Sequence, residues 1–180
     1  RPAALAARLN EACQCVWVDR GLVRDRLRAN LGDEANPFEQ RDGLVSGSVV
    51  FVGSRDAAAM DRAIRLITRA LTSDAFEARA SADAPPLARA PRPTAGGVLG
   101  FDFHLGGPTP QLIEVNTNPG GLLISHELAR AVTASCDCLA VPMPDLVAAR
   151  IALDRLPSVV AASFRDEWRR ARGDAPLRSI

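Results

Sequence analysis

The chain contains no lysine and no tyrosine, and aromatic residues make up only 4% of its 180 residues. All 22 basic residues are therefore arginines. The absence of lysine excludes a Gly-rich phosphate loop of the type whose lysine reaches the nucleotide phosphates. No G-x-S-x-G nucleophile elbow is present either. Alanine is abundant, and we attribute the arginine bias to a high-GC genome rather than to function.

Long apolar runs and a strong net charge are also absent. No apolar run reaches the roughly 18 residues that span a membrane, and no secretory signal opens the chain. The net charge is +1, so charge favours neither nucleic acid nor a membrane surface as a partner. We expect a cytoplasmic protein, most simply one domain, that binds neither.

Cysteine is scarce, and its spacing is unusual. The four cysteines form two C-x-C pairs, Cys13 with Cys15 and Cys136 with Cys138. Structural zinc sites usually place about two to four residues between their cysteines. Buried reduced thiols are therefore the simpler interpretation. A cysteine-bound zinc ion or iron–sulfur cluster stays open as an alternative.

The spacing of apolar residues predicts several helices and one isolated strand. The helices are expected at 3–16, 20–31, from Ser54 to about Leu71, 122–136, 145–156, and from Ser158 to about Gly173. Residues 44–52 are rich in β-branched residues and predict a buried or half-buried strand. Segments 33–43 and 81–95 are expected to be loops. Helices on a sheet indicate an α+β fold.

Residues 96–125 hold the one constellation whose chemistry follows from spacing. Two runs of alternating apolar and polar residues flank a Gly/Pro-rich turn, and this pattern predicts a β-hairpin. Because strand side chains alternate between faces, one face is expected to carry the apolar residues Phe101, Phe103, Leu105, Ile113 and Val115. The other face carries Asp102, His104, Glu114 and Asn116. If the turn is centred near Pro108, Leu105 faces Gln111 and Asp102 faces Glu114.

The opposed carboxylates of Asp102 and Glu114 predict a metal site. Like charges directly across a ladder repel each other, so a cation between them would explain the pair. Two carboxylates and the Asn116 amide suit Mg²⁺ or Mn²⁺ better than zinc or copper. His104 lies on the same predicted face, whereas His126 is expected to be structural. A hairpin with a merely solvated polar face is the alternative.

The hairpin resembles the metal-binding end of ATP-grasp enzymes, which include glutathione synthetase-like ligases. The resemblance rests on Asp102-Phe103-His104-Leu105 and then Glu114-Val115-Asn116-Thr117-Asn118-Pro119-Gly120-Gly121. The flanks are similar to circularly permuted ATP-grasp proteins, with a later segment that begins Glu167-Trp168-Arg169 and continues over 172–178. The similarity extends over most of residues 45–180. It implies a fold like the C-terminal ATP-grasp subdomain.

The resemblance implies an ADP-forming ligase that joins a small carboxylate to an amine or thiol through an acyl phosphate. Asp102 would bind one Mg²⁺ (or Mn²⁺), Glu114 would bridge two, and Asn116 would complete the second. Backbone N–H groups of the loop at Asn118, Gly120 and Gly121 would hold the acyl phosphate or the substrate carboxylate. We add His104 to the residues expected to contact the bound cofactor, ATP.

The chain departs from the ATP-grasp pattern because it has no lysine to hold the triphosphate and no recognisable adenine-binding hinge. In the permuted branch those parts would follow in sequence, so we expect a fragment of a longer protein, inactive alone. One partial domain would contain helices over 1–43, the sheet and hairpin over 44–138, and helices over 139–180. A non-catalytic ATP-grasp relic, serving as a binding or scaffold module, is the alternative.

Overall fold

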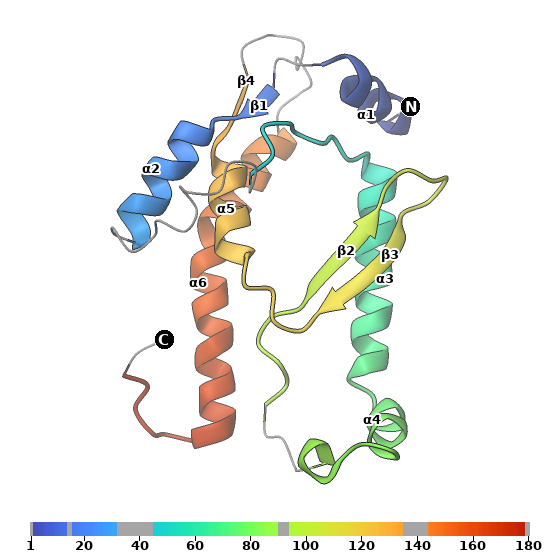
Figure 1. The fold of residues 1–180 in the computed structure, drawn as a ribbon, viewed down its shortest axis with the longest axis vertical. Helices are drawn as coiled ribbons and strands as arrows, with labels where there is room; N and C mark the ends of the chain where they lie inside the picture. Colours follow the sequence, from blue (N-terminus) through green and yellow to red (C-terminus); the bar gives the residue numbers. More distant parts are fainter. Residues whose placement is uncertain (1, 14–15, 32–44, 90–93, 135–143, 179–180) are drawn as a thin grey trace. The chain divides into compact units, whose positions relative to one another are not determined.

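The computed structural model describes residues 2–13, 16–31, 45–89, 94–134 and 144–178. Over these residues the chain has an α+β fold, with helices and two two-stranded antiparallel sheets (Figure 1). It divides into two compact units. The first comprises Arg1–Gly53 and Gly120–Pro157, and the second comprises Ser54–Pro119 and Ser158–Ile180. In the described part of the chain, no helix has the length and apolar character to cross a membrane.

The first unit is built around the contact between two helices. It contains α1 (Pro2–Ala12), β1 (Val16–Val18), α2 (Arg20–Leu31), α5 (Leu122–Arg130), β4 (Val132–Ala134) and the start of α6 (Pro144–Arg172). Val23, Leu27 and Ala131 are buried together, with Ile124 and Leu128 among the side chains packed against them. Asp19 Oδ1 accepts the N–H of Leu22 at 3.0 Å at the start of α2. The helix predicted over 20–31 is confirmed.

Two short strands lie where the sequence predicts helix or no regular structure. The helix predicted over 3–16 ends at Ala12, and the one predicted over 122–136 ends at Arg130. Both predictions were too long. β1 and β4 follow these helices and pair antiparallel, with Val18 opposite Val132. Three-residue strands are too short to show the alternation by which a strand is recognised in a sequence.

The strand predicted over 44–52 is wrong for the described residues 45–52. Within that stretch the structure has one isolated bridge, from Ser48 to Trp17, and Val50 is 66% exposed. The Asn10 side chain instead forms hydrogen bonds with both the N–H and the carbonyl of Phe51. Its Oδ1 accepts the N–H at 2.7 Å, and its Nδ2 donates to the carbonyl at 2.9 Å. β-branched residues favour extended backbone, but a strand also requires a partner to pair with.

The second unit carries the hairpin. It contains α3 (Ser54–Leu71), α4 (Asp74–Ser81), the 3₁₀ helix η2 (Pro86–Arg89), β2 (Gly100–His104), β3 (Gln111–Asn116) and the end of α6. α3 has the predicted bounds. The short helix η2 lies in the segment predicted to be a loop. Arg89 Nε donates to the Ala84 carbonyl at 2.6 Å, so this guanidinium is used within its own segment.

A single helix replaces the two predicted near the C-terminus. α6 runs without interruption from Pro144 to Arg172, with Pro157 inside it. A proline removes one helical hydrogen bond but does not always end the helix. Pro157 is also the last residue of the first unit, so the predicted break coincides with the boundary between units. α6 ends before Gly173, whose φ of 59° favours glycine.

Candidate metal site

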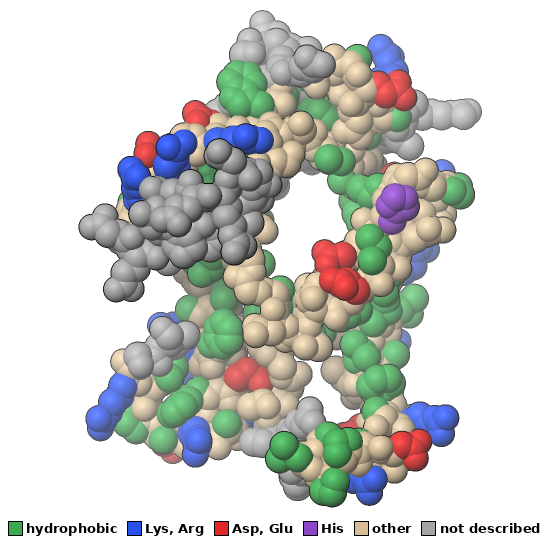
Figure 2. All heavy atoms as spheres, in the orientation of Figure 1, with side chains coloured by type: hydrophobic (Ala, Val, Ile, Leu, Met, Phe, Trp, Pro, Cys, Tyr) green, Lys and Arg blue, Asp and Glu red, His purple; other side chains and the backbone are tan. Residues whose placement is uncertain are grey.

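The hairpin places the two predicted carboxylates opposite each other. β2 and β3 are antiparallel, and the Asp102–Glu114 pair of the predicted register is confirmed. Gly100 lies opposite Asn116, at the end of β3 where the loop at 117–121 begins. In Figure 2, acidic side chains gather on the surface of this hairpin. Strand pairing therefore brings Asp102 of β2 together with Glu114 and Asn116 of β3 on one polar face of the hairpin.

A β-bulge changes the register beyond Asp102 and corrects the rest of the prediction. Phe103 pairs with Leu112 and His104 with Gln111, whereas Leu105 was expected opposite Gln111. Ile113 is the extra residue of β3, and it is 63% exposed rather than part of the apolar face. A bulge inserts one residue into one strand, so alternation counted across it assigns the wrong face.

Asn116 joins the two carboxylates. Its Nδ2 donates to Asp102 Oδ2 at 2.9 Å and to Glu114 Oε1 at 3.1 Å. Both carboxylates therefore lie within hydrogen-bonding distance of the same atom. Among the described residues, no arginine forms an ion pair with either acid. The positive end of the Asn116 amide dipole offsets part of the repulsion between the two negative charges.

His104 is close to this group in sequence but lies toward the turn. It is exposed, and it pairs with Gln111. A Cβ added at Gly106 would be 3.1 Å from His104 Nε2, so the imidazole lies against the turn backbone. No hydrogen bond connects it to Asp102, Glu114 or Asn116 within the described ranges.

The loop after β3 begins with a close contact. Asn118 is exposed, and Pro119 lies so near β2 that a Cβ at Gly100 would be 3.0 Å from the Pro119 Cβ. Gly120 and Gly121 belong to the first unit, where Gly121 precedes α5 with a φ of −84°. A Cβ at either glycine would meet no atom within 4 Å. The fold itself therefore does not require glycine at these two positions.

An anchor at the base of the hairpin was missed by sequence reasoning. The side chain of Glu167 in α6 is only 15% exposed. Its carboxylate accepts the N–H groups of Ala95 at 3.2 Å and Gly96 at 3.0 Å. Ser163 Oγ also donates to the Gly97 carbonyl. Glu167 lies three residues after Phe164 and so shares a helix face with it, which is the signal that the sequence offers for this position.

The remaining candidates stay apart from the hairpin. His126 is buried in the first unit, as expected of a structural residue, with Nε2 3.5 Å from Glu127 Oε1. Cys13 is half-buried, whereas Cys15, Cys136 and Cys138 lie outside the described residues. No cluster of three or more His, Cys, Asp or Glu side chains is arranged for a metal in the described part of the chain. The hairpin group is of a different kind, with two carboxylates and one amide.

Comparisons with known proteins find no relative: no family model matches, and no curated protein or solved structure is significantly similar. The hairpin and its motif resemblance are therefore the features from which a function can be proposed.

Proposed function

We propose that Asp102, Glu114 and Asn116 bind Mg²⁺ (or Mn²⁺) and that this chain carries the metal-site part of an ATP-grasp ligase. The observation that supports it is the convergence of both carboxylates on Asn116 Nδ2, at 2.9 and 3.1 Å. Asp102 and Glu114 are exposed and opposed, and neither has an arginine partner among the described residues, which favours a cation bound between them.

The Asn116 amide can serve as a metal ligand because its oxygen and its NH₂ group are nearly equal in shape. A half-turn about the terminal torsion exchanges Nδ2 for Oδ1. The group that donates to two carboxylates then becomes an oxygen ligand beside them. Two carboxylate ligands and one amide oxygen leave coordination positions for water and for phosphate oxygens, as is usual for Mg²⁺.

The proposed reaction transfers the γ-phosphoryl group of ATP to a carboxylate oxygen and releases ADP. An amine or thiol then attacks the acyl carbon, and inorganic phosphate leaves. The metal would supply charge neutralisation on the phosphate oxygens. Backbone N–H groups at Asn118, Gly120 and Gly121 would hold the acyl phosphate or the substrate carboxylate. His104 would contact the bound nucleotide from the end of β2.

The groups that hold the nucleotide would come from outside these 180 residues. The chain has no lysine with which to hold a triphosphate. We therefore propose that further ATP-grasp segments of a longer protein complete the site, and that this chain alone does not turn over ATP.

The ligase proposal is tested by ADP release from the full-length product of the reading frame, with Mg²⁺, ATP and a panel of carboxylates and amines or thiols. Glu114→Gln is expected to abolish ADP release, whereas Asp83→Asn, an exposed acid of the same unit, is expected to leave it unchanged. Full activity in Glu114→Gln contradicts the proposal. Metal binding without any ADP release by the unaltered protein would favour the non-catalytic module.

A further inference from the structure

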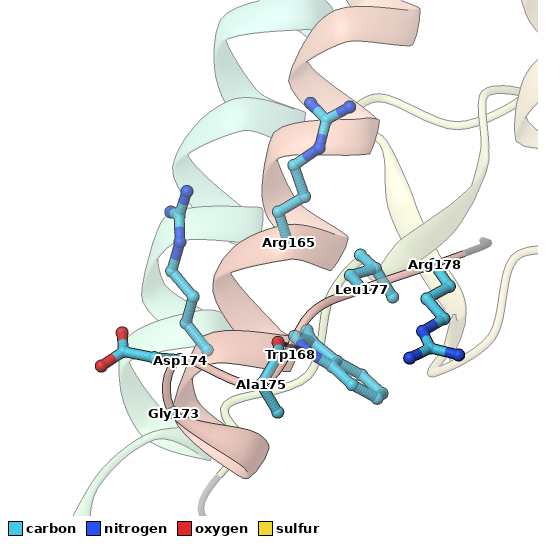
Figure 3. Close-up of a pocket in the computed structure, with 8 residues that line it drawn as sticks. Arg165, Trp168, Gly173, Asp174, Ala175, Leu177 and Arg178 are labelled. Atoms are coloured by element: carbon cyan, nitrogen blue, oxygen red, sulfur yellow. Dashed lines mark hydrogen bonds between the residues drawn. The ribbon is translucent and has the colours of Figure 1, made fainter.

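A cavity of about 470 Å³ lies at the C-terminal end of α6, within the second unit and on residues that the proposed metal site does not use (Figure 3). Its lining includes Arg165, Trp168, Arg169, Asp174, Leu177 and Arg178. Trp168 and Arg169 follow Arg165 by three and four residues on one helix, so each lies next to Arg165 on the helix surface. Leu177 and Arg178 come from the chain that follows α6 and approach this face (Figure 3).

The wall of the cavity is held in place by hydrogen bonds. Trp168 Nε1 donates to the Ala175 carbonyl at 2.7 Å, which fastens the segment after α6 to the helix. The N–H of Gly173 donates to the Arg169 carbonyl at 2.8 Å, and its positive φ turns the chain back. A site formed before binding loses less conformational entropy when a ligand enters.

The arginines of the lining extend in different directions: the Arg178 guanidinium lies beside Trp168, whereas the Arg165 guanidinium extends away from both (Figure 3). Arg169 is paired with Asp166 at 2.6 Å. Arg165 and Arg178 form no ion pair or side-chain hydrogen bond with the described residues. A guanidinium presents several N–H donors in one plane, which matches the oxygens of a phosphate or carboxylate.

The Trp168 indole supplies a flat apolar surface beside these charges. Its N–H is already used by Ala175, so the ring offers contact area rather than a further donor. The Arg172 guanidinium lies 5.9 Å from the ring centroid, so a further positive charge lies close to the indole. An aromatic ligand ring would gain from offset or edge-to-face packing on this indole.

We propose that this cavity binds a small anion that carries a flat ring, with its phosphate or carboxylate on Arg178 and its ring against Trp168. A single-stranded nucleic acid would use similar groups. It is disfavoured because the lining offers one tryptophan rather than the succession of aromatic side chains on which the bases of a strand stack. The lining of the cavity shares no residue with the proposed metal site.

The two tryptophans of the chain make a direct test possible. In a ¹H–¹⁵N spectrum, the indole N–H of Trp168 reports on the cavity, and that of Trp17 in the first unit is the internal control. The probes are AMP and 1-naphthoate, which combine a ring with phosphate or carboxylate, and adenosine and inorganic phosphate, which lack one part. AMP or naphthoate is expected to shift the Trp168 signal more than adenosine or phosphate does.

The variant Arg178→Gln is expected to weaken binding of the better probe by about tenfold or more. Arg55→Gln removes the same charge from an exposed position of α3 and is expected to bind normally. Equal binding by both variants overturns the proposal, and so does the absence of a Trp168 shift with all four probes. Tighter binding to an oligonucleotide than to AMP, increasing with its length, also overturns it in favour of a nucleic-acid surface.

Discussion

Asp102 and Glu114 occupy directly opposed positions of the β2–β3 ladder, and their carboxylates share one hydrogen-bond donor, Nδ2 of Asn116. Opposed like charges destabilise a hairpin. If the pair served only the fold, a neutral residue at either position would serve it better. Carboxylate and amide oxygens are ligands that hard divalent cations prefer, which is the basis of the proposed metal site.

Neutralising one acid is expected to stabilise the metal-free chain. Glu114→Gln removes the repulsion, while its amide oxygen can still accept from Asn116. We expect the free energy of unfolding to rise by about 0.2–1 kcal/mol, measured by urea denaturation in EDTA. Asp83→Asn, which is exposed in the same unit, should change it by less than about 0.5 kcal/mol. A clear loss of stability in Glu114→Gln would show that the charge itself supports the hairpin.

The contact between Gly100 and Pro119 predicts different effects for two glycines. In Gly100→Ala the new Cβ would lie 3.0 Å from the Pro119 Cβ, an atom of a rigid ring, and we expect a loss of about 1–3 kcal/mol. In Gly97→Ala the nearest atom is 3.6 Å away, on the Phe164 ring, so the change should be tolerated. Thermal unfolding of both variants measures the difference. Equal midpoints would contradict the close approach of the loop to β2.

Removing the charge of Glu167 is expected to destabilise the second unit. In Glu167→Gln one carboxylate oxygen becomes an NH₂ group facing the backbone N–H that it formerly bound at Ala95 or Gly96. The expected loss is about 1–3 kcal/mol. Asp166→Asn is the matched control, because Asp166 is exposed and paired with Arg169 on the surface, which is worth about 0–1 kcal/mol. Chemical denaturation should rank Glu167→Gln as the more costly change, and the reverse order would refute the anchor.

Gly121→Ala separates folding from the proposed function. Its φ of −84° suits any residue, and the added Cβ meets no atom within 4 Å. We expect the unfolding free energy to change by less than about 0.5 kcal/mol. ADP release by the full-length protein should fall, because a Cβ would obstruct the approach of an anion to the backbone N–H groups. Unchanged ADP release would remove Gly121 from the proposed site.

The parts of the fold that follow from local pattern could be predicted. The apolar stripes gave α2 and α3, and alternation gave the hairpin with Asp102 opposite Glu114. These elements depend on short-range periodicity and on turn residues, which a sequence displays directly.

The parts that depend on distant partners could not be predicted. The bulge at Ile113 has no local signature, and it moved Leu112 opposite Phe103. Residues 45–52 have strand propensity, but the backbone of Phe51 forms its hydrogen bonds with the Asn10 side chain instead of with a neighbouring strand. The hydrogen bonds of Glu167 join residues 71 and 72 positions apart in the chain, so spacing alone cannot reveal them. Intrinsic propensity indicates which secondary structures a segment can adopt, and tertiary contacts determine which of them it adopts in the fold.

The most direct test of the proposed metal site is a Mn²⁺ titration of the 180-residue chain, monitored by the loss of the free-ion signal in electron paramagnetic resonance. We predict saturable binding that Mg²⁺ displaces, loss of that binding in Glu114→Gln and in Asp102→Asn, and retention in Asp83→Asn. Equal Mn²⁺ binding by the unaltered chain and Glu114→Gln would contradict a site at this hairpin, as would no binding by the unaltered chain.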